Sequence, residues 1–455
     1  MKSSTSTSTA TAATAAASKD SVGFQNVQSS ADGRVYRFTL NPSHVTYANT
    51  LRRLVLTGVE TVAFRADMTS TGTTTDVLVK QNDTPMTNEM LADRVGLLPL
   101  NVPKPLEWKD NKYLFTLNVT GQKDHTTYVK AGDFVVKEIP TTSEAASSSA
   151  SSEESGDEKQ VVPESEWVRV PTETFFPPNP VTQDTCLIAT LQPSFGSAVQ
   201  NIEIVAKATK GTGREHARFS PVSQCSYEYS LDTDPQRIEE MFSRWLSVAK
   251  KVGSLDKASD RYQELRREFE TMEIKRCYLI NERGEPYSFD FTVETVGVLS
   301  VPYIIQRACE VGENMCSRYV NLETGDLPSE ITISTANSRI VGYDFLIKGH
   351  DHTLGNLLQT WIVEHLIEGN SSLGVTYAGY SIPHPLRDEM VLRIGVRGGQ
   401  ESTARKAFAE AAKGCMKIFQ ELRAAWMAAT GMRSSAAVRS DGRRALRQRP
   451  VFIES

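Results

Sequence analysis

The sequence of 455 residues predicts an α+β fold built around two related strand–helix units. Residues 35–40 alternate apolar and polar side chains, as a half-buried strand does, and the following residues place apolar side chains at helical spacing. The same order returns at 343–369. A long stripe of apolar residues at helical spacing follows each unit, which predicts a long helix after each one.

The first unit begins with the strand at 35–40 and continues into a helix. Asn41 is a candidate helix N-cap, and Pro42 suits the first turn. Gly58 fits the C-terminal end of the helix. The apolar face of this helix consists of Val45, Ala48, Leu51, Leu54 and Val55.

The second unit pairs a strand at 343–349 with an amphipathic helix that ends near Gly369. His350 and His352 at its start raise the possibility of a metal site. A metal needs three or four ligands, however, and this motif supplies two. Asp351 or Thr353 as an N-cap is the simpler interpretation, since a cap satisfies backbone N–H groups that have no helical partner.

The two long helices carry continuous apolar stripes, which normally pack against another helix. The first stripe consists of Ile304, Ile305, Ala308, Val311, Met315 and Tyr319. The second consists of Ala404, Phe408, Ala411, Cys415, Ile418, Leu422 and Trp426. A highly charged stretch at 234–272 also has a helical pattern, and we interpret it as one or two exposed helices.

Two short motifs invite a functional interpretation. The Gly-x-Gly within 210–216 could cradle a phosphate, but it lacks the full dinucleotide and Walker patterns, which favours a structured loop that contacts another protein. Arg52 and Arg53 lie beside Asn49 on the first helix. They form either a solvated face or, because the arginine fork suits carboxylates, an interface with another protein.

Composition excludes several classes of protein. There are 50 Lys and Arg against 55 Asp and Glu, a net charge of −5, which excludes a generally basic nucleic-acid coat and a wholly disordered acidic chain. No apolar run of about 18 residues predicts a membrane span. The six cysteines form no CxxC pair, which argues against paired zinc knuckles and indicates a reduced, intracellular protein. No nucleophile–base pair or carboxylate cluster indicates catalysis, and we expect no metal and no cofactor.

Three segments have biased composition. Residues 1–22 are rich in Ser, Thr and Ala and are expected to be disordered. The Ser-rich acidic segment at 141–166 is expected to be a disordered loop, either a spacer or a phosphorylated regulatory loop. The tail at 433–455 carries six Arg and one Asp between 433 and 449, and is either a contact for nucleic acid or an acidic partner, or a solubility tail.

Six segments together resemble the alpha-like subunits of multi-subunit DNA-directed RNA polymerases. In the first half they are 45–64, 88–100, 210–223 and 291–308, which resemble the larger subunit, archaeal D or eukaryotic subunit 3. In the second half they are HDHTLGNLL at 350–358 and GYSIPHPLRDEMVLRI at 379–394, which resemble the smaller subunit, archaeal L or eukaryotic subunit 11. Their order along the chain is that of the family, with both subunits in one polypeptide. Such fused forms resemble those of large cytoplasmic DNA viruses.

The resemblance implies two alpha-like dimerisation units that form an intramolecular pseudo-dimer, with a mostly β insert domain interrupting the first unit. The implied ranges are 23–60 and 276–322 for the first unit, 61–275 for the insert, 323–338 for a linker and 339–432 for the second unit. The cysteine cluster that binds a metal or an iron–sulfur cluster in many larger subunits is absent, so no metal is carried over. The charged stretch at 234–272 has no counterpart in the family pattern.

The resemblance also implies a function: a non-catalytic platform that holds the second-largest and largest polymerase subunits, together with small accessory subunits. DNA would be contacted only through the complex, no membrane would be involved, and the chain would not form a homodimer. The implied location is intracellular, in a viral factory or the host cytoplasm or nucleus, or packaged in the virion. The residues expected at subunit interfaces are Asn49, Leu51, Arg52, Arg53, Leu54, Gly211, Gly213, His216, His352, Thr353, Leu354, Gly355, Asn356 and Leu357. The helices around Leu51 and Leu357 are expected to form the seam, with Asn49, Arg52 and Arg53 reaching outward and the loop at 211–216 facing the second-largest subunit.

Two alternative functions remain from the residues alone. A stand-alone nucleic-acid-binding adaptor would use the Arg-rich tail and bind in a strongly salt-dependent way. An enzyme built on His350 and His352 would need a bound metal and a third ligand, and the sequence shows neither.

Overall fold

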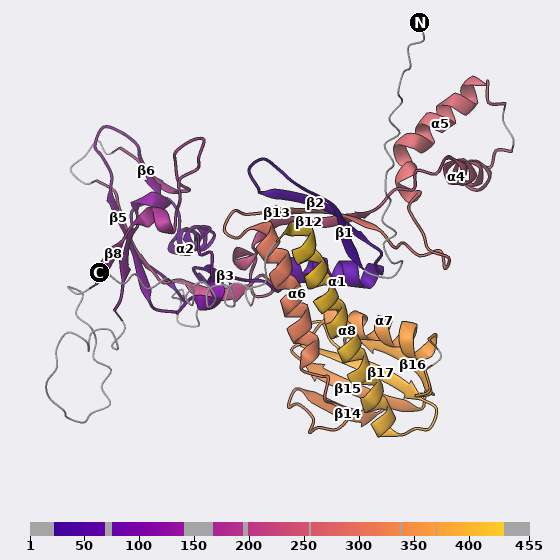
Figure 1. Ribbon diagram of the computed structural model, residues 1–455. Helices are drawn as coiled ribbons and strands as arrows, with labels where there is room; N and C mark the ends of the chain where they lie inside the picture. Colours follow the sequence, from indigo (N-terminus) through magenta and orange to yellow (C-terminus); the bar gives the residue numbers. More distant parts are fainter. Residues whose placement is uncertain are drawn as a thin grey trace, which may run out of the picture.

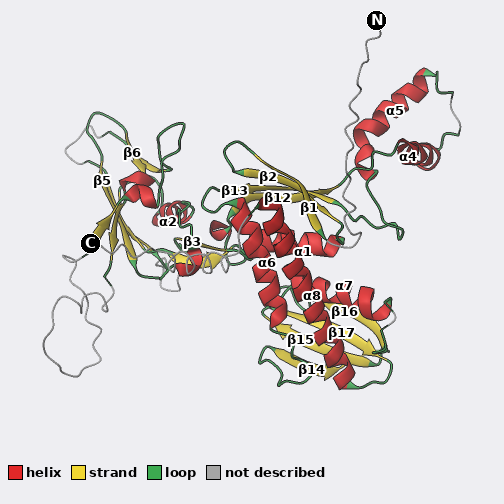
Figure 2. Ribbon diagram, in the orientation of Figure 1, coloured by secondary structure: helices red, strands yellow, loops and turns green. Residues whose placement is uncertain are grey.

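The computed structural model describes residues 22–68, 75–140, 167–193, 199–253, 256–336, 339–369 and 371–431. Three segments of biased composition lie outside the described residues: the predicted disordered start of the chain up to residue 21, the Ser-rich acidic segment at 141–166 and the Arg-rich tail at 433–455. The described chain forms two sheet-and-helix units, an insert domain and a protruding helical hairpin (Figures 1 and 2).

The first unit has a four-stranded antiparallel sheet in the order β1–β2–β13–β12. Its strands are β1 (Gly23–Ser29), β2 (Val35–Asn41), β13 (Phe289–Thr295) and β12 (Val222–Tyr229), and its helices are α1 (Val45–Thr57) and α6 (Val301–Ser317). Strand β12 pairs with β13 along its length. The range 61–275 expected for the insert therefore needs correction, because 222–229 belongs to the sheet of the first unit.

Helix α1 begins later than its predicted cap. Asn41 is the last residue of β2, and the peptide bond between Asn41 and Pro42 is cis. His44 is the N-cap instead, since its Nδ1 accepts a hydrogen bond from the Thr46 N–H at 3.2 Å. The helix ends at Thr57, and the Gly58 N–H donates to the Leu54 carbonyl, which agrees with the predicted C-terminal end.

The second unit repeats this plan. Its sheet has the order β14–β15–β17–β16, with β14 (Ile331–Thr335), β15 (Gly342–Lys348), β17 (Glu389–Val396) and β16 (Val375–Ser381). Helix α7 (His352–Ile362) continues into a π-helical turn (Val363–Ile367), and the 30-residue helix α8 (Glu401–Thr430) follows the sheet. Strand β14 lies inside the range 323–338 expected for a linker, so most of that linker's C-terminal half is part of the sheet.

One apolar core runs through both units, because α6 and α8 cross between them (Figure 1). Trp426 near the end of α8 is fully buried against the first sheet, 4.9 Å from the ring of Phe24 and 5.1 Å from that of Phe38. Its indole N–H donates to the Pro302 carbonyl at 3.0 Å. The last helix of the second unit therefore completes the core of the first, which makes the two units an intramolecular pseudo-dimer.

The α6–α8 contact is closer than the predicted stripes suggest. The face of α6 that is fully buried includes Cys309, Gly312 and Cys316, whereas Val311 and Met315 are only half-buried. A Cβ atom at Gly312 would lie 2.7 Å from the ring of Phe419 on α8. Glycine is therefore needed at this crossing, since any side chain would push the helices apart.

The insert domain is mostly β and has its own core, separate from that of the two units. A two-stranded ribbon of β3 (Glu60–Ala63) and β11 (Thr209–Thr212) leads into a five-stranded sheet of order β4–β10–β5–β7–β8 and a ribbon of β6 and β9. The remaining elements are β4 (Val77–Asn82), α2 (Asn88–Gly96), β5 (Tyr113–Thr120), β6 (Thr127–Lys130), β7 (Val135–Glu138), β8 (Val168–Val170), β9 (Leu187–Leu191) and β10 (Asn201–Ala206).

The charged stretch forms two helices, α4 (Pro235–Val248) and α5 (Asp260–Met272), which protrude from the end of the first sheet (Figure 1). Their small core consists of Phe242, Leu246, Leu265 and Phe269. None of the helices in the described ranges is long and apolar enough to cross a membrane.

Candidate functional site

We call the contact of α1 with α7 the seam; it lies beside the larger contact between α6 and α8. The four leucines expected there, Leu51, Leu54, Leu354 and Leu357, are all at most 5 % exposed and belong to the shared core. Fully burying a leucine side chain contributes about 1.5–3 kcal/mol. The seam is therefore held mainly by apolar packing, and its polar contacts fix the orientation of the helices.

Two of the polar contacts across the seam form a reciprocal pair. The Arg53 Nε donates to the Thr353 hydroxyl at 2.8 Å, and the hydroxyls of Thr46 and Thr360 lie 3.1 Å apart. Thr353 follows Thr46 by 307 residues, and Thr360 follows Arg53 by the same 307. Each contact is thus the pseudo-two-fold image of the other, as in the isologous interface of a symmetric dimer.

Arg53 faces the seam, which corrects the expectation that it reaches outward. Its Nη2 lies 3.1 Å from the Asp351 carboxylate, the N-cap of α7. Burial raises the pKa of Asp351, but hydrogen bonds from Thr353 and the charges of Arg53 and Arg214 outweigh this and lower it overall. Asp351 therefore caps the second helix and pairs with the first unit in its charged form.

The opposite end of the seam holds a second polar cluster. The Tyr47 hydroxyl donates to Glu364 at 2.8 Å, and the His44 Nε2 lies 3.7 Å from the same carboxylate. Burial, followed by the charge of Glu364, raises the pKa of Tyr47, so this phenol remains a hydrogen-bond donor at neutral pH. Both ends of α1 are therefore tied to the second unit.

The loop at 211–216 of the insert domain contacts the second unit. Arg214 donates to the Gly349 carbonyl at 3.0 Å and pairs with Asp388. A Cβ at Gly213 would overlap the Leu56 carbonyl oxygen, and one at Gly211 would lie 2.7 Å from the ring of Phe219. Gly213 allows the loop to lie against the end of α1, and Gly211 leaves room for the ring of Phe219, so both glycines have packing roles.

Sequence reasoning missed Arg218, two residues after His216. Its side chain is 3 % exposed and donates to the Phe64 carbonyl at 3.0 Å. His216 is the N-cap of the short turn that contains Arg218 (Ala217–Phe219), with its Nδ1 accepting from the Arg218 N–H at 3.1 Å. A lone arginine in a charged loop gives no signal of burial, and only the neighbouring Phe219, fully buried, marks the loop as part of the core.

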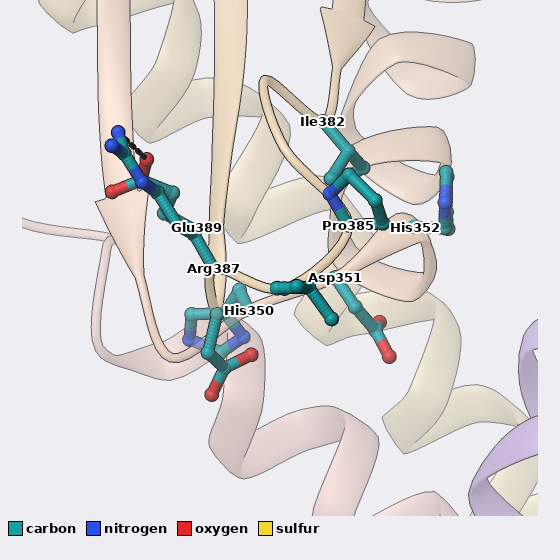
Figure 3. Close-up of a pocket in the computed structure, with 9 residues that line it drawn as sticks. His350, Asp351, His352, Ile382, Pro385, Arg387 and Glu389 are labelled. Carbon is teal, nitrogen blue, oxygen red and sulfur yellow. Dashed lines mark hydrogen bonds and ion pairs between the residues drawn. The ribbon is translucent and has the colours of Figure 1, made fainter.

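The His350–Asp351–His352 motif lines a hollow of about 510 Å³ together with the loop that precedes β17 (Figure 3). Asp351 Oδ1 accepts from the Thr353 N–H at 2.8 Å, which confirms the capping interpretation. The two histidine rings do not converge (Figure 3): His350 packs against Tyr319, and His352 Nδ1 lies 3.2 Å from the Tyr380 hydroxyl. Within the described ranges, no group of three or more His, Cys, Asp and Glu could hold a metal.

The two other predicted residues of α7, Gly355 and Asn356, also have partners within the chain. A Cβ at Gly355 would lie 2.5 Å from the ring of Tyr380, so the helix lies directly on strand β16. The Asn356 side chain donates to the Thr46 hydroxyl at 3.3 Å across the seam. Gly355 therefore allows α7 to pack closely on its own sheet, and Asn356 links α7 to the first unit.

Asn49 and Arg52 lie on the outer side of α1, facing an open hollow of about 470 Å³ beside strand β12. The Arg52 Nε donates to the Asn49 Oδ1 at 3.0 Å. Residues 225–229 of β12 form the opposite wall of the hollow. Of the polar residues expected to reach outward from α1, these two do so, and no carboxylate pairs with Arg52 in the part of the chain that the structure describes.

Comparison with known protein families gives two matches on separate stretches of the chain. A family model described as the RNA polymerase Rpb3/Rpb11 dimerisation domain matches residues 37–316. A second model with the same description matches residues 343–425. The first match covers the first unit from within β2 onward together with the insert, and the second match covers most of the second unit.

Curated relatives are similar over more than half of this chain. Human "DNA-directed RNA polymerases I and III subunit RPAC1" is 26 % identical over 300 residues, covering 60 % of this chain and 77 % of the relative. Arabidopsis thaliana "DNA-directed RNA polymerases IV and V subunit 3B" is 23 % identical over 300 residues, covering 60 % and 83 %. The "Conjugation stage-specific protein" of Tetrahymena thermophila is 23 % identical over 293 residues, covering 59 % and 85 %.

Proposed function

Because the chain belongs to the RNA polymerase Rpb3/Rpb11 dimerisation family, we propose that it is a non-catalytic assembly platform of a DNA-directed RNA polymerase. In this role both alpha-like halves are supplied by one polypeptide, which docks the second-largest and largest subunits that carry the active site. Similarity to DNA-directed RNA polymerase subunits supports the role of a non-catalytic polymerase subunit. The docking of particular partners is the proposal.

The observation that carries this proposal is the single core shared by two family domains. Two separate stretches match the same dimerisation family, and Trp426, the residue directly after the second stretch, packs against Phe38 in the first. Joining two partners in one chain replaces a bimolecular association by an intramolecular one, at roughly millimolar effective concentration for a short linker. The pair therefore stays assembled when the protein is scarce, and the dimerisation surface is already occupied, so the chain needs no second copy.

The docking face proposed for the second-largest subunit includes Asn49 and Arg52 on the outer side of α1. These side chains are half-buried and open to the hollow beside β12. The loop at 211–216 flanks the seam from the insert domain. Small accessory polymerase subunits are expected to bind elsewhere on the platform, and DNA is expected to contact the chain only through the complex.

The fusion also supports a proposal about the source. Fused alpha-like subunits resemble those of large DNA viruses, so we extend the proposal to a viral polymerase that works inside an infected cell or is packaged in the virion. Immunoblotting of purified virions and of fractionated infected cells against this chain tests the location.

A tagged pull-down from the native source tests the function, with the captured proteins identified and quantified by mass spectrometry. Recovery of two very large polymerase subunits in equal amounts, with no separate small alpha-like partner, supports the platform. Native mass measurement of the purified chain should show a single-chain species. Recovery of the chain alone, or only with nucleic acid that is lost at high salt, would instead favour a stand-alone adaptor that uses its Arg-rich tail.

A further inference from the structure

The two sheets can be superposed residue by residue through their registers. In the first sheet Tyr227 lies opposite Phe291, which lies opposite Phe38. In the second sheet Tyr380 lies opposite Leu392, which lies opposite Phe345. Phe345 follows Phe38 by the same 307 residues that relate the seam contacts. Tyr227 and Tyr380 therefore hold equivalent positions on the outer strands β12 and β16.

The helices carry different residues beside these two positions. Residue 359 follows residue 52 by 307, so Gln359 is the counterpart of Arg52. The Gln359 side-chain oxygen accepts a hydrogen bond from the Tyr380 N–H at 3.0 Å. The second unit thus caps the open edge of its own sheet. Arg52 has donors only, so it cannot do the same for the first unit.

The edge of β12 is open where Arg52 faces it. The Ser230 N–H donates to the Ser288 carbonyl at 3.0 Å, so the even-numbered residues of β12 bond to β13. Bonding direction alternates along an antiparallel strand, which turns the N–H and C=O groups of Cys225, Tyr227 and Tyr229 outward. Strand β12 ends its sheet, and no backbone partner covers this edge among the described residues.

The charge of the hollow favours an acidic occupant. The guanidinium of Arg52 has a hydrogen bond to Asn49 but no carboxylate partner in the described ranges. Glu228 on the hollow's wall is 72 % exposed and pairs with Lys275, so its charge is matched outside the hollow. The outer edge of β12 therefore offers unpaired backbone groups beside the guanidinium of Arg52. The backbone groups suit an extended polypeptide, and the guanidinium suits a carboxylate on that polypeptide.

We propose that this hollow binds an extended, Asp- or Glu-containing segment of a partner protein, which adds a strand to β12 and places its carboxylate on Arg52. The inference rests on the proposed platform function, because it supplies the chemistry by which one polymerase subunit is held. The pseudo-two-fold explains why only one half binds it: Gln359 seals the equivalent edge of the second unit. Replacement of Gln by Arg at one position converts a closed edge into a docking edge.

The free chain provides the first test, by amide hydrogen exchange read at single residues. Arg52→Gln recreates the arrangement of the second unit, so the Tyr227 amide should exchange at least several-fold more slowly than in the unmodified chain. Arg267→Gln, on the exposed face of the α4–α5 hairpin, is the control and should leave Tyr227 unchanged. Unchanged exchange in Arg52→Gln would overturn the geometric premise.

The assembled complex provides the second test. In the complex captured by the tagged chain, the amides of Tyr227 and Tyr229 should become protected, and a photo-crosslinker at Tyr229 should label a partner peptide that contains Asp or Glu. Capture of that partner should fall at least tenfold for Arg52→Gln, fall less for Arg52→Lys, and stay unchanged for Arg267→Gln, since charge-assisted hydrogen bonds are the strong ones.

The outcomes separate the two proposals. Full capture of polymerase subunits by Arg52→Gln, with Tyr227 unprotected in the complex, would overturn the strand-addition site and leave the platform intact. A cross-link to nucleic acid at Tyr229 would also overturn it, because the occupant would then be a phosphate. Recovery of the chain without polymerase subunits would overturn both.

Discussion

Truncation of Trp426 to alanine tests whether the two units truly share one core. Trp426 belongs to the last helix of the second unit, but its ring is fully buried between Phe24 and Phe38 of the first sheet. If the core is continuous, Trp426→Ala should destabilise strands that lie almost 400 residues earlier in the sequence. A local effect on α8 alone is the competing expectation.

The magnitude follows from the contacts of the ring. Replacing a buried Trp by Ala costs about 3–5 kcal/mol. The ring of Trp426 makes one edge-on contact, with Phe24, and one tilted contact, with Phe38, and we take a loss of about 4 kcal/mol within this range. The indole N–H bond to the Pro302 carbonyl is lost as well. Against a total stability of about 5–15 kcal/mol for a typical domain, a loss of this size removes about a quarter or more.

Hydrogen exchange and chemical denaturation together measure the effect. A loss of about 4 kcal/mol should speed exchange of the most protected amides of β1 and β2 by roughly a thousandfold, since about 1.4 kcal/mol is a factor of ten. Trp245→Ala is the matched control: its ring packs on Phe242 and Phe269 in the separate hairpin core, so it should leave β1 and β2 unaffected. Faster exchange confined to α8 in Trp426→Ala would refute the shared core.

Three further predictions concern the seam and the long helices. Burial, followed by the charges of Arg214 and Arg318, lowers the pKa of His350 below its usual value of 6.5, so the unfolded state binds a proton at a higher pH than the folded state does. The stability that comes from neutral His350 is therefore complete above about pH 6.5 and is lost as the pH falls below it. Replacing His350 by Asn should make the denaturant midpoint fall less between about pH 7 and 5.5. Gly312→Leu should cost about 1–3 kcal/mol or more by overpacking against Phe419, and an unchanged melting temperature would contradict the close α6–α8 crossing. Arg53→Glu should weaken the seam by about 1 kcal/mol through repulsion from Asp351; the effect is small because both side chains are about a third exposed. The charge swap Arg53→Glu with Asp351→Arg should recover part of this loss. A double-mutant cycle that shows no coupling would mean that the pair contributes nothing to stability.

The elements with strong periodicity were predictable from the sequence. The strands at 35–40 and 343–349, the cap at Asp351 and both long helices lie where the pattern places them. Strand β12 was not found, because it is an edge strand whose outer residues are polar: only Val222 and Cys225 are buried. Alternation of apolar and polar residues is weak in such a strand, so it was absorbed into the expected insert.

The seam residues show what local pattern cannot decide. Arg52 and Arg53 are neighbours in sequence, yet consecutive residues of a helix point about 100° apart. Which of them faces the partner depends on where α7 lies, and α7 is about 300 residues downstream. The same limit explains the helix start, where Asn41 and Pro42 satisfy local capping rules but the strand runs through Asn41 and His44 takes the cap.

The position of Trp426 also sets the order in which the protein can be completed during synthesis. Trp426 follows Phe38 by 388 residues, and at about 5–20 residues per second the ribosome needs roughly 20–80 s to make the intervening chain. Throughout that interval the apolar side of the first sheet has no helix α8 to cover it. In a pair of separate subunits the wait would depend on cellular concentration and chance encounter. Here it is set by translation speed, so slow codons between the two halves would prolong exposure of the unfinished sheet and the time available to chaperones.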